Sequence, residues 1–395
     1  GVIFDLSSHR RAREALELAL SMREPGFNVF VLGENRSGRL TSTVDFLRDA
    51  VGDDKAPDDW VYLNNFSQLS EPVAVRLPGG EGRKLRSGLQ QLVGALTQAL
   101  RAAFSGEAFQ KHMQSEGEGA QNALNAEMKA IQDAAREKGL DIVQTEQGQM
   151  IVVVDDNGEP VPADQMNDEQ RALVAEHGPA LAQQIHAVNR KTAEVQAGFQ
   201  KRAAELGREV ADQTCGPLID AAMADFSDHH GLNRWLVELR ADIIDNFQAF
   251  LPQPEEGGLP AEFAPQRRYA VNLFVDNRLS KMAPVIVEAN PTYENLFGRI
   301  EYRQSARSME TDFTLIRPGA FHRANGGVIV LRADAIASSP GIWPFIKGAL
   351  RDHEIRIEEP YRSNGPTVAG ALSPTPVPLD VKVVLIGEPN WYYTF

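Results

Sequence analysis

The chain has 395 residues, which exceeds the usual size of one hydrophobic core and predicts two or more folded units. Hydrophobic residues make up 43% of it, enough for a core, and the formal net charge of −14 argues against a general nucleic-acid-binding surface. The single cysteine, Cys215, excludes an intrachain disulfide and favours a reducing cytoplasm, and no apolar run reaches the roughly 20 residues that span a bilayer.

The first hundred residues alternate between helix and strand patterns. We expect a helix near residues 8–22, a strand at 28–32, a helix at 43–51 and a strand at 60–63. Such alternation predicts parallel strands joined by right-handed crossovers.

A glycine turn, Gly33-Glu34-Asn35-Arg36-Ser37-Gly38, separates the first expected strand from the helix that we expect near Thr43. A strand, a glycine turn and a helix N-terminus form the setting in which backbone N–H groups bind phosphates. The complete motif needs a lysine and a hydroxyl directly after the second glycine, whereas this chain has Arg39 and Leu40, with a hydroxyl only at Thr41. We interpret Gly33, Gly38, Arg39 and Thr41 as a degenerate phosphate-binding turn; the alternative is a simple strand-to-helix turn.

From about residue 104 to 250 the chain becomes polar and helical in period. A seam of steps of four and three is typical of a coiled coil and runs through Leu181, Ile185, Val188, Thr192, Val195, Phe199, Arg202, Leu206 and Val210, in which Arg202 is a flaw. Leu124, Met128, Ile131 and Ala135 share the spacing and predict the partner helix. Residues 141–145 and 150–154 flank Gln147-Gly148 like a hairpin, so we expect an antiparallel arm with a small β element at its far end. Either the arm is purely structural or it contacts substrates or partners.

A Pro- and Gly-rich linker at 251–260 closes this region, and strand patterns resume at 269–275, 285–288, 328–331 and 381–386. Arg332 stands where a phosphate-loop ATPase has an acidic residue for Mg²⁺, and its positive charge predicts that the usual metal coordination is lost. If the strand continues, Asp334 lies on the same face as Arg332 but about 6 to 7 Å further along.

Three other features are weaker candidates for chemistry. His353-Glu354 begins like a zinc protease helix but lacks the second histidine and alternates like a strand, so we reject it. His229-His230, with Asp225 nearby, falls short of the three or four ligands of a zinc site and is interpreted as a helix-end cluster. Cys215 is interpreted as a small helix-packing residue.

Long, ordered stretches of the chain resemble Lon-related proteases of the AAA+ class, whose ATPase-like module is split by a long helical insertion. The most specific stretches are VIVEANPTYENLFGRIE (residues 285–301) and TDFTLIRPGAFHRANGG (311–327), and the resemblance extends to residues 11–17, 25–33, 60–66 and 378–387. Family members often have a more glycine-rich loop and an acidic residue after the strand that ends at Leu331. This chain has Arg36 and Arg332 at those places, which predicts weak or absent ATP hydrolysis.

The resemblance implies an α/β fold with an AAA+-like parallel-sheet core, divided into residues 1–103 and 266–395 by a helical insertion at 104–265. It also implies a homo-oligomeric ring that handles substrate polypeptides. The family's nucleotide site takes ATP and Mg²⁺, but the replacements at Arg39, Leu40 and Arg332 weaken the expectation of both in this chain. Asn390 is a candidate for the residue that senses the γ-phosphate, although a simple turn residue is the favoured interpretation. No segment resembles the serine and lysine region of Lon proteases, so we expect a fragment whose protease domain lies outside these residues. The alternative function is a nonenzymatic scaffold for oligomerisation and partner binding.

Overall fold

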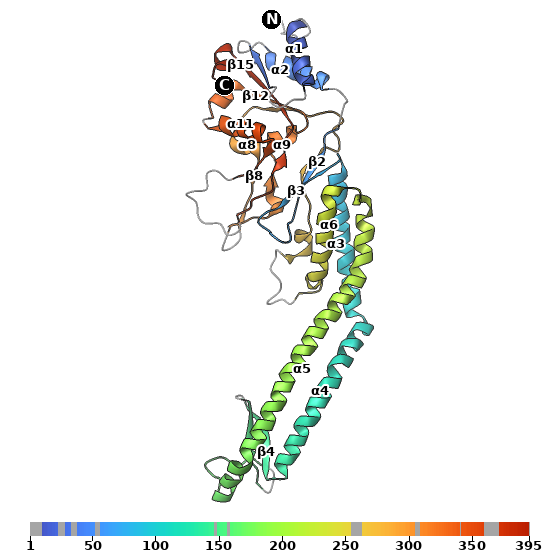
Figure 1. The fold of residues 1–395 in the computed structure, drawn as a ribbon, viewed down its shortest axis with the longest axis vertical. Helices are drawn as coiled ribbons and strands as arrows, with labels where there is room; N and C mark the ends of the chain where they lie inside the picture. Colours follow the sequence, from blue (N-terminus) through green and yellow to red (C-terminus); the bar gives the residue numbers. More distant parts are fainter. Residues whose placement is uncertain are drawn as a thin grey trace. The chain divides into compact units, whose positions relative to one another are not determined.

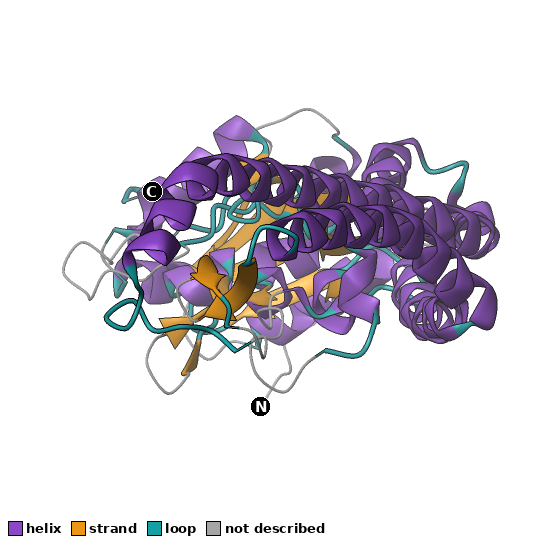
Figure 2. Cartoon of the chain, turned by 90° about the horizontal axis from the view of Figure 1, so that it is seen from below, coloured by secondary structure: helices purple, strands orange, loops and turns teal. Residues whose placement is uncertain are grey.

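The computed structural model describes residues 10–22, 28–32, 38–51, 56–145, 148–155, 159–253, 263–304, 309–339, 341–358 and 371–394. Figure 2 distinguishes the helices from the strands of this part of the chain. In chain order, the helices are α1 (Arg10–Ser21), α2 (Arg39–Ala50), α3 (Glu81–Ser105), α4 (Glu107–Arg136), α5 (Asp168–Met223), α6 (His230–Asp245), α7 (Pro265–Arg268), α8 (Tyr293–Phe297), α9 (Ala320–Ala324), α10 (Ala333–Ala337), α11 (Ile342–Asp352) and α12 (Pro389–Tyr392). Short 3-10 helices are η2 (Ala224–Phe226), η3 (Phe247–Phe250) and η5 (Phe313–Leu315).

The strands, in the same order, are β1 (Val29–Leu32), β2 (Asp59–Leu63), β3 (Val73–Leu77), β4 (Leu140–Thr145), β5 (Gly148–Val153), β6 (Asn272–Val275), β7 (Val285–Glu288), β8 (Arg299–Ile300), β9 (Arg303–Gln304), β10 (Met309–Glu310), β11 (Ile316–Arg317), β12 (Val328–Arg332), β13 (Glu354–Ile355), β14 (Val377–Pro378) and β15 (Lys382–Gly387). Contacts divide the chain into two compact units. The α/β unit comprises residues 1–97 and 216–395, and the helical unit comprises residues 98–215. Among the described helices, none combines the length and apolar character that a membrane crossing needs.

Four parallel strands form the main sheet of the α/β unit, in the order β1-β15-β12-β7. Each is a short run rich in Val, Ile and Leu, as expected for strands covered by other elements on both faces. Figure 1 shows β12 and β15 beside each other in this unit. The structure therefore confirms the strands expected at 28–32, 285–288, 328–331 and 381–386, and the parallel-sheet core.

The strand pattern at 60–63 belongs to a different sheet. β2 pairs antiparallel with β3 and β6, in the order β3-β2-β6. The prediction that the strands near 60–63 and 269–275 join the parallel set was therefore wrong. All five residues of β2 are buried, so its sequence has no alternation that could reveal its partners, and β3 was not anticipated at all.

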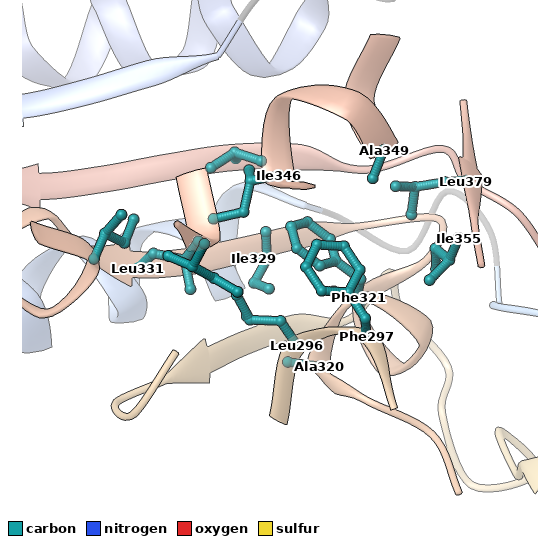
Figure 3. Packing of buried hydrophobic residues seen from close by; sticks show 14 of the residues in the cluster. Leu296, Phe297, Ala320, Phe321, Ile329, Leu331, Ile346, Ala349, Ile355 and Leu379 are labelled. Atoms are coloured by element: carbon teal, nitrogen blue, oxygen red, sulfur yellow. The ribbon is translucent and has the colours of Figure 1, made fainter. Parts of the chain in front are cut away.

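The main core of the α/β unit lies between β12, β15 and the helices α8, α9 and α11 (Figure 3). Phe297 of α8 and Phe321 of α9 stack with ring centroids 5.3 Å apart, and Ile329 and Leu331 of β12 belong to the same cluster. Both rings are buried, and their contact joins two short helices that could not persist alone.

Two backbone segments, around Gly298 and Gly319, approach each other very closely beside the core. Gly298 has φ +86°, and a Cβ atom there would lie 2.4 Å from the carbonyl oxygen of Arg317. A Cβ on Gly319 would lie 2.3 Å from the carbonyl oxygen of Leu296. This close approach therefore requires glycine at both positions.

His322 lies buried beside this close approach. Its Nδ1 accepts a hydrogen bond from the Gly319 N–H at 3.0 Å, so Nδ1 carries no proton and the neutral ring carries it on Nε2. Nε2 is buried and has no hydrogen-bond partner among the described residues, and the ring meets the Phe274 ring edge-on at 4.7 Å. Burial, with a smaller effect of Arg323, lowers the pKa of His322 to about 3.

Residues at the two ends of β2 form hydrogen bonds with three helices of the α/β unit. Asp59, its first residue, accepts hydrogen bonds from the N–H groups of Gly80 at 2.8 Å and Gly82 at 3.0 Å, and so caps the start of α3. Burial raises the pKa of Asp59 although these bonds favour its ionised form. Asn64, just past the other end, accepts from Trp235 of α6 through its carbonyl and donates its amide to the Arg268 carbonyl of α7.

A buried ion pair joins α6 to α7. The guanidinium of Arg268 donates to both carboxylate oxygens of Asp242, at 2.7 and 2.6 Å, and the Tyr269 hydroxyl donates to the same carboxylate at 2.9 Å. The side chains of Arg268 and Asp242 are only 6% and 10% exposed, so water can compensate little for the loss of either charge. Arg268 also lies over the rings of Phe66 and Phe263.

Two long antiparallel helices, α4 and α5, form the helical unit and lie side by side (Figure 1). Lys191 pairs with Glu127 at 2.6 Å, and Gly117 lies where a Cβ would be 3.3 Å from the Phe199 ring. The expected seam positions Leu181, Ile185 and Val188 are buried. Arg202 is exposed and pairs with Glu205, whereas its neighbour Ala203 is half-buried, so the predicted flaw in the seam is confirmed.

The predicted hairpin is confirmed at the junction of α4 and α5. β4 and β5 pair antiparallel over six residues each, with Ile142 opposite Ile151 and Leu140 opposite Val153. These four side chains pack with Ala135 and Leu181 in the core of this end of the unit. Gly148 has φ +116°, which a residue with a side chain rarely adopts, and Gln147 lies outside the described residues.

Candidate functional site

The carboxyl ends of the four parallel strands meet at one edge of the sheet. The register places Leu32 of β1 beside Gly387 of β15, Ile386 beside Arg332 of β12, and Leu331 beside Glu288 of β7. Ligands of open parallel sheets bind at this edge, because loops and helix N-termini converge there. The residues that follow these four ends are therefore the ones to consider.

Helix α2 begins at Arg39, four residues before the start that the sequence led us to expect near Thr43. Gly38 is its N-cap with φ 69°, and the Gly38 carbonyl accepts from the Ser42 N–H at 3.0 Å. As a glycine, Gly38 has no side chain that could cap the helix, so the sequence carries no capping signal at this start. Thr41 is exposed in the first turn, whereas Gly33 and the side chain of Arg39 lie outside the described residues.

Arg332 ends β12, and the next residue begins helix α10, so the expectation that Asp334 continues the strand was wrong. The Ala-rich sequence Ala333-Asp334-Ala335-Ile336-Ala337 favours a helix, with Asp334 in its first turn. The turn brings the two side chains together. Arg332 Nε and Nη2 donate to the two Asp334 oxygens at 3.1 and 2.6 Å, and both side chains remain more than 40% exposed.

The end of β15 is crowded by neighbours that only glycine tolerates. A Cβ on Gly387 would lie 2.8 Å from the Ala333 Cβ and 3.2 Å from the Phe30 ring. Asn390 follows in α12 and is exposed, and its carbonyl accepts a hydrogen bond from the Thr394 hydroxyl at 3.5 Å. The ring of Tyr392 meets that of Phe30 edge-on at 5.5 Å. Asn390 thus follows the end of β15 closely. Its expected role in sensing a γ-phosphate stays a prediction.

Two pairs of opposite charge lie at this edge among the residues that the structure describes. Asp334 forms an ion pair with Arg332. The carboxylate of Glu288 lies 3.9 Å from the guanidinium of Arg323 and accepts a hydrogen bond from the Asn290 N–H at 2.9 Å. Glu288 was missed in the sequence, where only its place at the end of a strand could have drawn attention to it. A phosphate group could bind here through backbone N–H groups at the start of α2. Binding of a divalent cation would require Asp334 to release Arg332.

The other candidates lie outside this edge. His353 ends α11 with φ 52°, and the following Glu354–Ile355 is β13, which pairs with β14, so the strand interpretation is confirmed. His230 begins α6 and His229 precedes it beside Phe226, at a helix end as predicted. Cys215 is buried, and burial raises its pKa to about 11, which agrees with a packing role.

Two parts of the chain match models of known protein families. Residues 281–395, from just before β7 to the last residue, match the family model described as LonB-like, AAA domain. Residues 59–92, which include β2, β3 and the first part of α3, match the Lon-like LonC helical domain. A search of curated proteins found no match. The parallel sheet and these two matches together support a relationship to Lon-related proteins of the AAA+ class.

Proposed function

We propose that this chain is the AAA+-like module of a Lon-related serine protease, which assembles into a homo-oligomeric ring and delivers substrate polypeptide to a proteolytic domain outside these residues. The observation that carries the proposal is the parallel sheet β1-β15-β12-β7, whose strands β7, β12 and β15 fall within the stretch similar to the LonB-like AAA domain. On this proposal, the division into residues 1–103, 104–265 and 266–395 corresponds to a split module and its insertion, and the protein acts in the cytoplasm.

The proposal includes a weakened nucleotide site. Arg332 is held by Asp334 at the end of β12, where a divalent cation would need a free carboxylate. The phosphate-binding lysine and the Mg²⁺ hydroxyl of the complete motif are replaced by Arg39 and Leu40. We infer that Gly33, Gly38, Arg39, Thr41 and Asn390 surround a site that binds ATP weakly or not at all, so substrate handling does not depend on hydrolysis.

The test uses the full-length protein that contains this chain. An open reading frame that continues into a serine and lysine protease domain supports the proposal, whereas a stop codon soon after Phe395 favours the scaffold alternative. Purified protein should form a ring by native mass spectrometry and degrade a permanently unfolded protein equally well with and without ATP and Mg²⁺. A monomer without peptidase activity, or degradation that needs ATP, would contradict the proposal.

A further inference from the structure

The helical unit is well packed toward its two ends but not in its middle. Toward the hairpin, Leu124 of α4 and Val188 of α5 are buried, and Cys215 is buried near the other end of α5. Between these ends, no described side chain of residues 107–123 or 189–206 is buried. Because buried apolar area is the main source of stability, the middle of the unit adds little to it.

The sequence of α4 accounts for this weak middle. Between Met113 and Leu124, the helix has no apolar side chain larger than that of alanine. The same stretch contains Gly117 and Gly119, and each glycine lowers the equilibrium constant for helix formation about fivefold relative to alanine. Gly117 lies against the Phe199 ring of α5, where a Cβ would be 3.3 Å from the ring. A helical stretch of this composition depends on contacts with other elements.

Polar contacts do not attach this part of α4 to α5. Among the described residues, no hydrogen bond or ion pair joins residues 107–123 to α5. Its charged side chains pair along α4 instead, as Lys111 does with Glu107 at 3.6 Å, and both of these side chains are more than 70% exposed. Such exposed pairs contribute little to stability. Only beyond the segment does an ion pair reach α5, between Glu127 and Lys191 at 2.6 Å.

Gly106 separates the start of α4 from the end of α3. Its backbone is extended, with φ −67° and ψ 143°, and no side chain caps α4. Two contacts with Phe104 of α3 bridge the break: the Phe109 ring meets the Phe104 ring at 4.7 Å, and the Gln110 side chain donates to the Phe104 carbonyl at 3.2 Å. Because the helix is interrupted at Gly106, α4 can unwind from its start without unwinding α3.

We propose that residues 107–123 form an opening segment, which detaches from α5 and unwinds reversibly while α3 and the hairpin end of the helical unit stay folded. In the open state, α5 alone connects the two packed ends of the unit. The low burial, the two glycines and the break at Gly106 each lower the free energy of this opening. The proposal goes beyond the proposed function and does not depend on it.

The test measures hydrogen exchange of the purified 395-residue chain by mass spectrometry, with rates corrected for the intrinsic exchange of each residue. Amide hydrogens of residues 110–123 should exchange at least about tenfold faster than those of residues 128–136 of the same helix. Gly119→Ala should slow exchange of residues 110–123 about fivefold and leave residues 128–136 unchanged. A Cβ at Gly119 meets nothing within 4 Å, so the substitution changes helix stability without a new contact.

Gly94→Ala is the matched control. Gly94 is an exposed glycine inside α3, and a Cβ there also meets nothing within 4 Å. The substitution should favour helix to the same degree but leave exchange of residues 110–123 unchanged, because α3 ends before Gly106. Phe109→Ala acts in the opposite direction: it removes the ring contact with Phe104 and should speed exchange of residues 110–123 about threefold or more.

Equal protection of residues 110–123 and 128–136 overturns the proposal. It is also overturned if Gly119→Ala slows exchange equally in both halves of α4, since the helix then opens as a whole. Slowing of residues 110–123 by Gly94→Ala would show that α3 and α4 open together, with the same consequence. These outcomes are separate from failure of the proposed function, which concerns the ring and proteolysis and is measured on the full-length protein.

Discussion

Asp242 of α6 accepts both hydrogen bonds of the Arg268 guanidinium in a site almost closed to water. Asp242→Ala leaves the Arg268 charge buried without its partner, and we expect it to lower the free energy of unfolding by about 3 to 5 kcal/mol. The comparison is Arg234→Ala on the same helix, which breaks an exposed pair with Glu238 and should cost less than about 1 kcal/mol. Urea titration measures the free energy of unfolding of both variants. Equal losses would show that the buried pair contributes no more to stability than the exposed pair.

Alanine substitutions at Gly298 and Gly326 separate the free-energy cost of an unfavourable backbone conformation from the cost of steric crowding. Both have positive φ, but a Cβ at Gly326 meets nothing within 4 Å, whereas one at Gly298 would lie 2.4 Å from a carbonyl oxygen. Gly326→Ala should therefore cost about 1 to 2 kcal/mol. Gly298→Ala should cost more than about 4 kcal/mol or prevent folding. Thermal melting of the two variants decides this, and similar melting temperatures would refute the close approach described for Gly298.

We expect the free energy of unfolding to fall in mild acid because His322 is buried in its neutral form. Its pKa is about 3 in the folded state against 6.5 when unperturbed, so between these values the unfolded chain binds a proton that the folded chain does not. Falling pH therefore favours unfolding, by up to about 1.4 kcal/mol per pH unit. In His322→Asn this contribution is absent. Urea titrations from pH 7 to 5 should show a steeper decline for the parent, and parallel curves would contradict the buried, neutral ring.

ATP hydrolysis by the isolated chain should be negligible, because Arg39, Leu40 and Arg332 stand where the complete site has a lysine, a hydroxyl and a carboxylate. A coupled phosphate-release assay checks this. Turnover at about 1 per second or more that disappears on Arg39→Ala would disprove it. Binding of nucleotide without turnover agrees with it, since backbone N–H groups can hold phosphates.

Deletion of residues 109–211 with a short flexible connection should leave the α/β unit folded, because contacts separate residues 98–215 from the rest. Circular dichroism and thermal melting would show a cooperative transition. Loss of that transition would mean that the helical unit is needed for the fold. In the full-length protein, the same deletion should slow degradation of an unfolded protein, and an unchanged rate would leave the helical unit with a structural role only.

The parallel sheet and the helical unit were accessible from the sequence because their patterns are local. The run Val328–Leu331 is short, rich in β-branched residues and preceded by two glycines, which favours a buried strand. The steps through Leu181, Ile185 and Val188 are those of a helix with one apolar stripe. The hairpin at Gly148 followed from two β-rich runs around a glycine.

Two of the failures concern contacts between residues distant in the chain. The fully buried β2 gives no sign of which sheet it joins, and nothing near Asp59 indicates that it caps a helix beginning at Glu81. At the candidate site, the family resemblance supplied the expected positions. The pairing of Arg332 with Asp334 depended on a helix beginning one residue after β12, which a strand pattern cannot foretell.

Asp59 and Asn64 lie at opposite ends of β2 and bind helices before and after the helical unit in the chain: Asp59 caps α3, by which the chain leaves the α/β unit, and Asn64 contacts α6 and α7, which follow its return. Neither attachment involves a residue of 98–215. The number of helical turns between the two attachments can therefore grow or shrink in evolution without disturbing the strand that holds them. A family built on this plan could vary the reach of its insertion freely while the α/β unit stays the same.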